Sequence, residues 1–201
     1  SNRKLNYALS DFDRTHVVQS YLTWELPFGN GKRFGNSAGA WTNRLIGGWL
    51  ASGFFTLQGG RPFTVYSGSN TVSNVVNSPA NCNGCTRKDG AVFDDPSQGL
   101  KFYLNEAQRA RFSIPGAGEL GNTGRKFFRG PGSFSMDAAL RKRSAITERV
   151  QLELRADFTN LTNTPTFGFP TATVTATTFG RIRDSVISGS RKIQLGAKIH
   201  F

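Results

Sequence analysis

Two segments near the end of the chain alternate apolar and polar residues with a period of two, which is the period of a β-strand. In residues 191–201 every odd position from Ile193 to Phe201 is apolar, and every even position is polar or glycine. Residues 150–159 repeat the pattern, with Val150, Leu152, Leu154, Ala156 and Phe158 alternating with polar and charged residues. Each segment therefore predicts a strand with one apolar face and one polar face.

Three further runs predict strands of the same kind. Residues 134–141 carry apolar side chains at every even position, and the link 144–149 is short enough for a hairpin, which predicts that this strand pairs with 150–159. Residues 16–28 alternate up to Pro27, where the strand should end. Residues 44–58 place Leu45, Trp49, Ala51, Phe55 and Leu57 on one face, with a possible continuation at 61–66.

The connections between these five strands alternate in length. The stretch from Ser67 to Gly132 has no sustained periodicity and is rich in turn-forming residues, and a medium loop spans Leu161 to Ser190, whereas the turns near Gly29 and Ser144 are short. Strands of about ten residues joined in this way are typical of barrels that cross a bilayer. The predicted fold class is all-β: antiparallel up-and-down strands of a transmembrane β-barrel. A soluble secreted β-sandwich that binds a glycan or a protein is the alternative reading.

Composition narrows the function classes. No run of about 18 apolar residues is present, so the chain has no transmembrane helix, and the opening residues 1–4 lack the apolar core of a signal peptide. The formal net charge is +12, but the basic residues are scattered and only 125–129 and 141–143 form clusters. We therefore expect no nucleic acid as a partner.

Aromatic residues stand near the ends of the predicted strands, where they fit the interfacial girdles of a barrel. They are Trp24, Phe28, Trp49, Phe55, Phe158 and Phe201. A second aromatic group, Phe102, Tyr103 and Phe112, lies in the long loop, and we expect it to pack locally rather than to form a ligand platform.

Both cysteines of the chain, Cys82 and Cys85, lie in a segment of turn-forming residues. A zinc site needs more ligands, and a thioredoxin-like CxxC pair should begin a helix after a strand, which the asparagines and Gly84 disfavour. The interpretation is a small loop disulfide, which suits an oxidising compartment.

Two short motifs match catalytic or nucleotide-binding patterns. Residues 35–39 match GxSxG and residues 116–121 match GxGxxG, but neither has the preceding strand that these sites need. His16 and His200 stand near strand ends without a carboxylate pair or a metal-binding spacing. We expect no enzyme activity, no catalytic or metal site and no cofactor.

Many short motifs follow one another in an order that resembles the end of Oar-like TonB-dependent outer-membrane receptors, which often carry a carboxypeptidase-regulatory-like domain. The resemblance covers nearly the whole chain, and it rests on Gly60-Arg61-Pro62-Phe63-Thr64-Val65, Gly121-Asn122-Thr123-Gly124-Arg125, Arg129-Gly130-Pro131-Gly132, Asp137-Ala138-Ala139-Leu140, Ile146-Thr147-Glu148-Arg149, Arg155-Ala156-Asp157-Phe158-Thr159-Asn160-Leu161-Thr162-Asn163, Phe167-Gly168 and Phe179-Gly180-Arg181-Ile182. The closing Phe201 resembles the C-terminal signal by which such barrels are recognised for assembly.

The resemblance implies a large barrel, commonly of about 22 strands with an internal plug, whose last five or so strands are present here. The expected domain is then 1–201 as the C-terminal part of the barrel, with 68–132 as a long extracellular loop and the plug, TonB box and signal peptide absent. The implied function is energy-coupled uptake of a bulky solute. Implied partners are outer-membrane lipid, the barrel-assembly machinery, the TonB complex through the missing N-terminal part, and an unknown transported ligand.

Two sets of site residues follow from this reading. With the C-terminus in the periplasm, the Gly29 and Ser144 turns are periplasmic, and 67–132 and 161–190 lie outside the cell. The assembly signal comprises Ile193, Leu195, Ala197, Ile199 and Phe201. The lumen-facing residues are Gln151, Glu153, Arg155, Asp157, Lys192, Gln194 and Lys198, which form either a solute path or a wetted wall against a plug.

Overall fold

The computed structural model describes residues 7–72, 77–95, 100–182 and 186–201, and it divides into two compact units. The opening residues 1–4 lie outside the described residues. The first unit comprises residues 1–17, 58–133 and 166–187, and the second comprises 18–57, 134–165 and 188–201.

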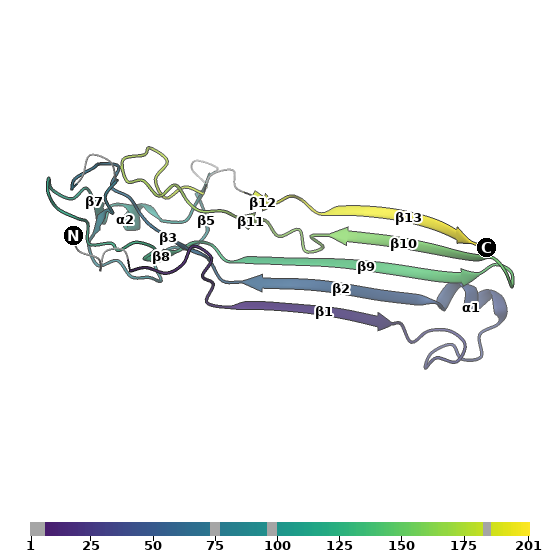
Figure 1. Ribbon diagram of the computed structural model, residues 1–201. Helices are drawn as coiled ribbons and strands as arrows, with labels where there is room; N and C mark the ends of the chain where they lie inside the picture. Colours follow the sequence, from purple (N-terminus) through teal and green to yellow (C-terminus); the bar gives the residue numbers. More distant parts are fainter. Residues whose placement is uncertain (1–6, 73–76, 96–99, 183–185) are drawn as a thin grey trace. The chain divides into compact units, whose positions relative to one another are not determined.

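The second unit is built on one five-stranded antiparallel sheet (Figure 1). Its strands follow the order β1 (Val17–Glu25), β2 (Trp49–Gln58), β9 (Ser133–Ala145), β10 (Gln151–Thr159) and β13 (Lys192–His200). Neighbours in this order are also successive long strands along the chain, so the sheet is an up-and-down meander. The five expected strands and the pairing of 134–141 with 150–159 are therefore confirmed.

The register fixes the two faces of this sheet. Leu152 lies opposite Ile199 on one side and Ser144 on the other, and each second position along the strands keeps to the same face. Glu153 lies between Lys198 and Arg143 on the opposite face. The alternation seen in each strand alone is thus in phase across three strands.

The connection between β1 and β2 corrects two expectations. It spans residues 26–48 and is therefore longer than the short turn expected near Gly29. Residues 44–46, predicted as the start of a strand, belong instead to the short helix α1 (Ala40–Ile46), and β2 begins only at Trp49. Gly48, at φ +73°, makes the turn between them, and a Cβ at this position would clash with the carbonyl oxygen of Arg143. Leu45 and Gly47 share the parity of the strand by coincidence, because a helix of less than two turns is too short to show a period of its own.

The first unit has a hydrophobic core of its own. It contains short antiparallel pairs, β3 with β8, β4 with β7, β5 with β6 and β11 with β12, and the one-turn helix α2 (Glu106–Arg109). The short strands are β3 (Pro62–Phe63), β4 (Asn81–Cys82), β5 (Phe93–Asp95), β6 (Leu100–Phe102), β7 (Phe112–Ser113), β8 (Phe128–Arg129), β11 (Thr166–Phe167) and β12 (Val186–Ser188). The stretch expected as one very long loop is therefore a folded region, because aromatic packing replaces regular secondary structure.

Aromatic rings hold this core together. Phe128 is fully buried, and its ring centroid lies 5.9 Å from that of Phe63 and 5.6 Å from that of Phe112. Phe112 in turn meets Phe179 edge to face at 5.2 Å, so residues 166–187 pack against 58–133. Phe102 and Tyr103 are also buried, so the aromatic group of the long loop is packed as expected, although Phe112 packs against Phe179 from a distant segment. Burying one such ring contributes about 1.5–3 kcal/mol.

Neither helix in the described part of the chain has the length and the hydropathy that a membrane-spanning helix needs.

Candidate functional site

The first candidate site is the polar face of the five-stranded sheet. All seven residues that the sequence assigned to a lumen share this face, because Gln151, Glu153, Arg155 and Asp157 on β10 lie opposite His200, Lys198, Gly196 and Gln194 on β13, and Thr159 lies opposite Lys192. β9 extends the face with Arg141 and Arg143.

Charges on this face are partly paired. The Arg143 Nε donates to Glu153 Oε2 at 2.6 Å, and the Arg155 Nε donates to Asp157 Oδ1 at 2.9 Å.

Two exposed aromatic rings, Tyr21 and Phe54, share a shallow hollow with Asp157. Sequence reasoning did not single out these two rings, although both stand at positions of polar parity in their strands.

The opposite face of the sheet is apolar. The residues assigned to the assembly signal, Ile193, Leu195, Ala197 and Ile199, lie opposite Phe158, Ala156, Leu154 and Leu152, and Phe201 follows the last strand. Leu195 exposes 78% of its surface and Leu154 exposes 43%. In the described part of the second unit, no residue of this face belongs to a hydrophobic core. The buried residues of that part of the unit are Gly29, Gly47, Lys142 and Asn160. The apolar face therefore needs a partner of low polarity.

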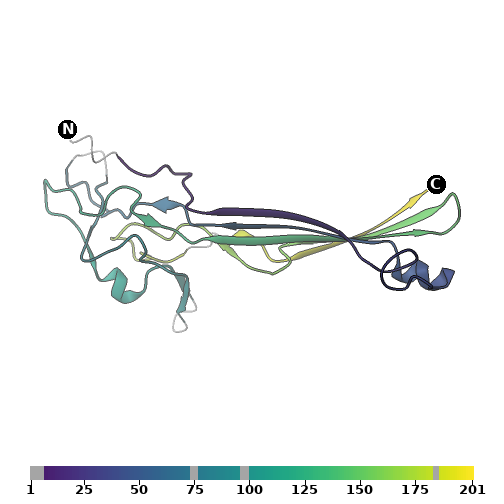
Figure 2. The same ribbon diagram turned by 90° about the horizontal axis from the view of Figure 1, so that it is seen from below.

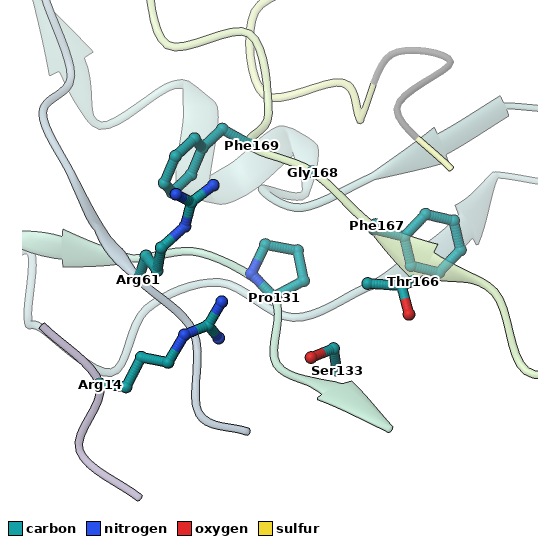
Figure 3. A pocket seen from close by; sticks show the side chains of 8 residues that line it. All are labelled: Arg14, Arg61, Pro131, Ser133, Thr166, Phe167, Gly168 and Phe169. Atoms are coloured by element: carbon teal, nitrogen blue, oxygen red, sulfur yellow. The ribbon is translucent and has the colours of Figure 1, made fainter. Parts of the chain in front are cut away.

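The second candidate site is a pocket in the first unit that holds two arginines (Figure 3). It is lined by Arg14, Arg61, Pro131, Ser133, Thr166, Phe167, Gly168 and Phe169. The Arg14 Nη1 donates to the carbonyl oxygen of Gly59 at 2.8 Å, which fixes one guanidinium. The Arg61 guanidinium carbon lies 5.0 Å from the centroid of the Phe169 ring, which fixes the other by a cation–π contact.

None of the described residues that line this pocket carries a carboxylate. The two nearest in sequence to Arg14, Asp11 and Asp13, form ion pairs with Lys126 and Arg129 instead. The Lys126 ammonium, by its hydrogen bond and its charge, holds the pKa of the Asp11 carboxyl below its usual range. Two guanidinium groups beside the hydroxyls of Ser133 and Thr166 form an arrangement that can bind a carboxylate, a phosphate or a sulfate.

Sequence reasoning missed this pocket. Its residues come from four separate segments, and their only signals were three strings quoted for the resemblance, Gly60-Arg61-Pro62, Arg129-Gly130-Pro131-Gly132 and Phe167-Gly168. A single arginine in a turn-rich segment carries no sign that a second one packs beside it.

The remaining sequence-predicted residues have ordinary surroundings. The structure joins Cys82 and Cys85 in a disulfide, with Cys82 buried and Cys85 packed against the core. The GxSxG string ends at Gly39, which is the N-cap of α1, and the GxGxxG string forms a turn in which the Glu119 carboxylate accepts from Gly116 N. No group of three or more potential metal ligands occurs within the described residues.

Comparison with known proteins identifies the family. A family model described as "Outer membrane beta barrel domain" matches residues 1–194, which covers the sheet up to the third residue of β13. Searches of curated proteins and of solved structures gave no match. The two-faced meander and this match agree, and the chain belongs to the outer membrane beta barrel domain family and resides in the bacterial outer membrane.

Proposed function

We propose that this chain supplies part of the wall and the extracellular loops of an Oar-like TonB-dependent receptor, which takes up a bulky solute with energy transmitted from the inner membrane. The observation that supports this proposal most directly is the register of β9, β10 and β13, which places apolar and charged side chains on opposite faces of one sheet. A transmembrane barrel needs this arrangement, with an apolar face toward lipid and a wetted face toward its interior.

The charged face fits the interior of a wide barrel. Glu153 lies between cations on both neighbouring strands, and Asp157 lies beside Tyr21 and Phe54, so the wall offers charged, polar and aromatic contacts. Either a solute or a plug can use such contacts. We assign the seven residues to this wetted wall, because a barrel interior is polar whatever its cargo.

The first unit supplies the ligand-facing part in this proposal. Its segments 58–133 and 166–187 share one core, so the two predicted extracellular loops act as a single folded surface. The arginine pocket in this unit is suited to an acidic group of the solute, since no described residue of its lining offers a carboxylate to the two guanidinium groups.

The alternative of a soluble β-sandwich meets an energetic obstacle. A sandwich buries the apolar face of each sheet against a second sheet, whereas Leu195 and Leu154 of this sheet are exposed and the second unit lacks a described hydrophobic core. The family match, with its outer-membrane location, also favours the barrel.

Fractionation of the source cell distinguishes the membrane barrel from the soluble sandwich. An antibody raised against 68–132 should detect a heat-modifiable band, several times larger than 22.0 kDa, in the outer-membrane fraction, and should also label intact cells. A soluble band near 22.0 kDa would instead support the sandwich.

Energy coupling needs its own measurement. The full-length receptor, solubilised from the outer membrane, should cross-link to the periplasmic domain of TonB, and removal of its N-terminal segment should abolish the cross-link. A receptor that never cross-links, while remaining in the outer membrane, would leave the barrel in place and overturn the TonB-dependent part of the proposal.

A further inference from the structure

The segment between β1 and β2, residues 26–48, contains exposed apolar side chains that neither the sheet nor the proposed transport accounts for. Trp41 and Leu45, one helical turn apart on α1, expose 78% and 72% of their surface. Phe28 and Phe34 of the same segment contact each other and are also exposed. Apolar residues of this size that are so largely exposed in one connection need an explanation.

α1 is fixed to the apolar face of the sheet. The Lys142 ammonium, which shares that face with Leu140 and Leu154, donates to the carbonyl oxygens of Leu45 and Gly47, both at 2.8 Å. The Ser144 hydroxyl, two residues along β9 on the same face, donates to the carbonyl oxygen of Arg44 at 3.1 Å. The C-terminal carbonyls of α1 are thus held from the side of the sheet that carries the apolar residues.

Trp49 completes this attachment. Its indole Nε1 donates to the carbonyl oxygen of Leu45 at 3.1 Å, and its ring lies 4.8 Å from the Lys142 Nζ. Figure 1 shows α1 at the end of the sheet where β2 begins and β9 ends, and Figure 2 shows it to one side of the strands. The helix therefore continues the apolar face beyond the ends of the strands.

The charges near α1 indicate which partner it meets. A hollow beside the helix is lined by Lys32, Arg44 and Arg143 but by no carboxylate. Lys32 is paired with Glu25 and Arg143 with Glu153, whereas Arg44 forms no ion pair with a described residue and lies over the Trp41 ring at 5.1 Å. A tryptophan, a leucine and an arginine at the rim of an apolar surface match the boundary between acyl chains and phosphate headgroups.

We propose that α1 is an interfacial anchor that inserts Trp41 and Leu45 into the periplasmic leaflet of the outer membrane and places Arg44 at the headgroup phosphates. The partner is a phospholipid with an anionic headgroup. This inference rests on the proposed function for which face of the sheet meets lipid and for which ends of the strands lie at the periplasm. It adds a lipid-binding element to a connection that a barrel otherwise needs only as a turn.

Spin labels on single cysteines test the proposal in the full-length receptor, reconstituted in bilayers of phosphatidylethanolamine and phosphatidylglycerol. Labels are placed at Leu45→Cys, at Leu154→Cys on the apolar face and at Lys198→Cys on the charged face. Relative accessibility to molecular oxygen and to a water-soluble nickel complex reports whether each label lies in lipid or in water. Leu45 is exposed, so its replacement should not impair folding.

The three labels separate the possible failures. We expect the label at residue 45 to match that at 154, with oxygen favoured over nickel, and the label at 198 to favour nickel. A label at 45 that matches the one at 198, while 154 remains in lipid, overturns the anchor and leaves the barrel wall intact. A label at 154 that lies in water overturns the face assignment and with it both proposals.

A second measurement tests the headgroup. The ratio of oxygen to nickel accessibility at the residue 45 label is compared between bilayers with and without phosphatidylglycerol. Arg44→Gln should reduce the rise in this ratio that phosphatidylglycerol causes. Lys88→Gln, at an exposed turn of the first unit, should leave that rise unchanged. An equal response of both variants would contradict the role of Arg44.

Discussion

Lys142 shows how one residue can break a pattern for a local reason. It occupies an apolar-face position of β9, yet it is buried, because its ammonium donates to two carbonyl oxygens at the end of α1 and lies over the Trp49 ring. The helix end would otherwise leave these acceptors without partners. An isolated lysine in an apolar row is therefore a structural clamp, and the sequence alone gives no sign of it.

Removing this clamp should release α1. Lys142→Met keeps the length of the side chain but loses both hydrogen bonds, each worth about 1.5–3 kcal/mol when the donor is charged. Amide hydrogen exchange of residues 45–48 should accelerate, while exchange in β10 should be unchanged. Lys198→Met, on the opposite face, is the matched control, and acceleration in that variant too would argue against a specific clamp.

Tyr103 should make the first unit sensitive to alkali. Burial raises the pKa of the Tyr103 phenol in the folded state, and its hydroxyl donates to the carbonyl oxygen of Arg129 at 2.6 Å. The unfolded phenol ionises near pH 10, so the contribution of this group to stability is fully present below that pH and is lost as the pH rises further.

The variant Tyr103→Phe isolates this effect. Near pH 7 it should lower the free energy of unfolding by about 1–3 kcal/mol, because the Arg129 carbonyl loses its donor. Above pH 10 its stability should fall less steeply than that of the wild type. Thermal unfolding followed by near-ultraviolet circular dichroism across this pH range measures both slopes, and parallel slopes would contradict the assignment.

The arginine pocket should show itself by anion binding. Inorganic phosphate should raise the unfolding temperature of the receptor relative to chloride at equal ionic strength, and Arg61→Gln should abolish this shift, because the guanidinium held by Phe169 is lost. Arg87→Gln removes a cation that lies over Phe127 outside the pocket and is the control. A shift that survives in Arg61→Gln would place the anion elsewhere.

At the scale of elements, prediction succeeded where side chains alternate and failed where distant contacts decide the structure. β10 and β13 were predicted within one or two residues, because four or five successive alternations leave little choice of face. α1 was missed because its seven residues offer less than two helical turns of pattern. The first unit was missed because its two-residue strands are stabilised by rings from far along the chain, such as Phe112 against Phe179.

The disulfide belongs to one of these short elements. It links Cys82 in β4 to Cys85, closing a loop of four residues beside the core. Cys82→Ser with Cys85→Ser should lower the free energy of unfolding by about 2 kcal/mol on the chain-entropy estimate. Thiol alkylation and mass spectrometry of the wild type should find both cysteines unreactive until a reductant is added. Alkylation of the untreated, folded protein would contradict the bond.

At the scale of the whole molecule, several described cations of each unit have a carboxylate of the same unit beside them. The chain carries +12, but cations on the polar face of the sheet lie beside Glu153 and Asp157, and in the first unit Lys126 and Arg129 pair with aspartates. A nucleic-acid surface would concentrate unpaired cations on one side. The arrangement instead fits a wall in which each face has its own environment.

This difference between the two faces gives the most direct test of the barrel wall. Leu154→Arg places a charge among Ala197, Leu152 and Ala156, and near the centre of a bilayer it should cost about 2–4 kcal/mol and reduce assembly in the outer membrane. Gln194→Arg adds the same charge on the opposite face, directly across from Asp157, where water and a carboxylate compensate for it. The amount of heat-modifiable protein in the outer-membrane fraction should therefore fall for Leu154→Arg and stay near the wild-type level for Gln194→Arg. Equal loss in both variants would mean that neither face meets lipid in the proposed way, because only a difference in environment can make one charge costly and an identical charge harmless.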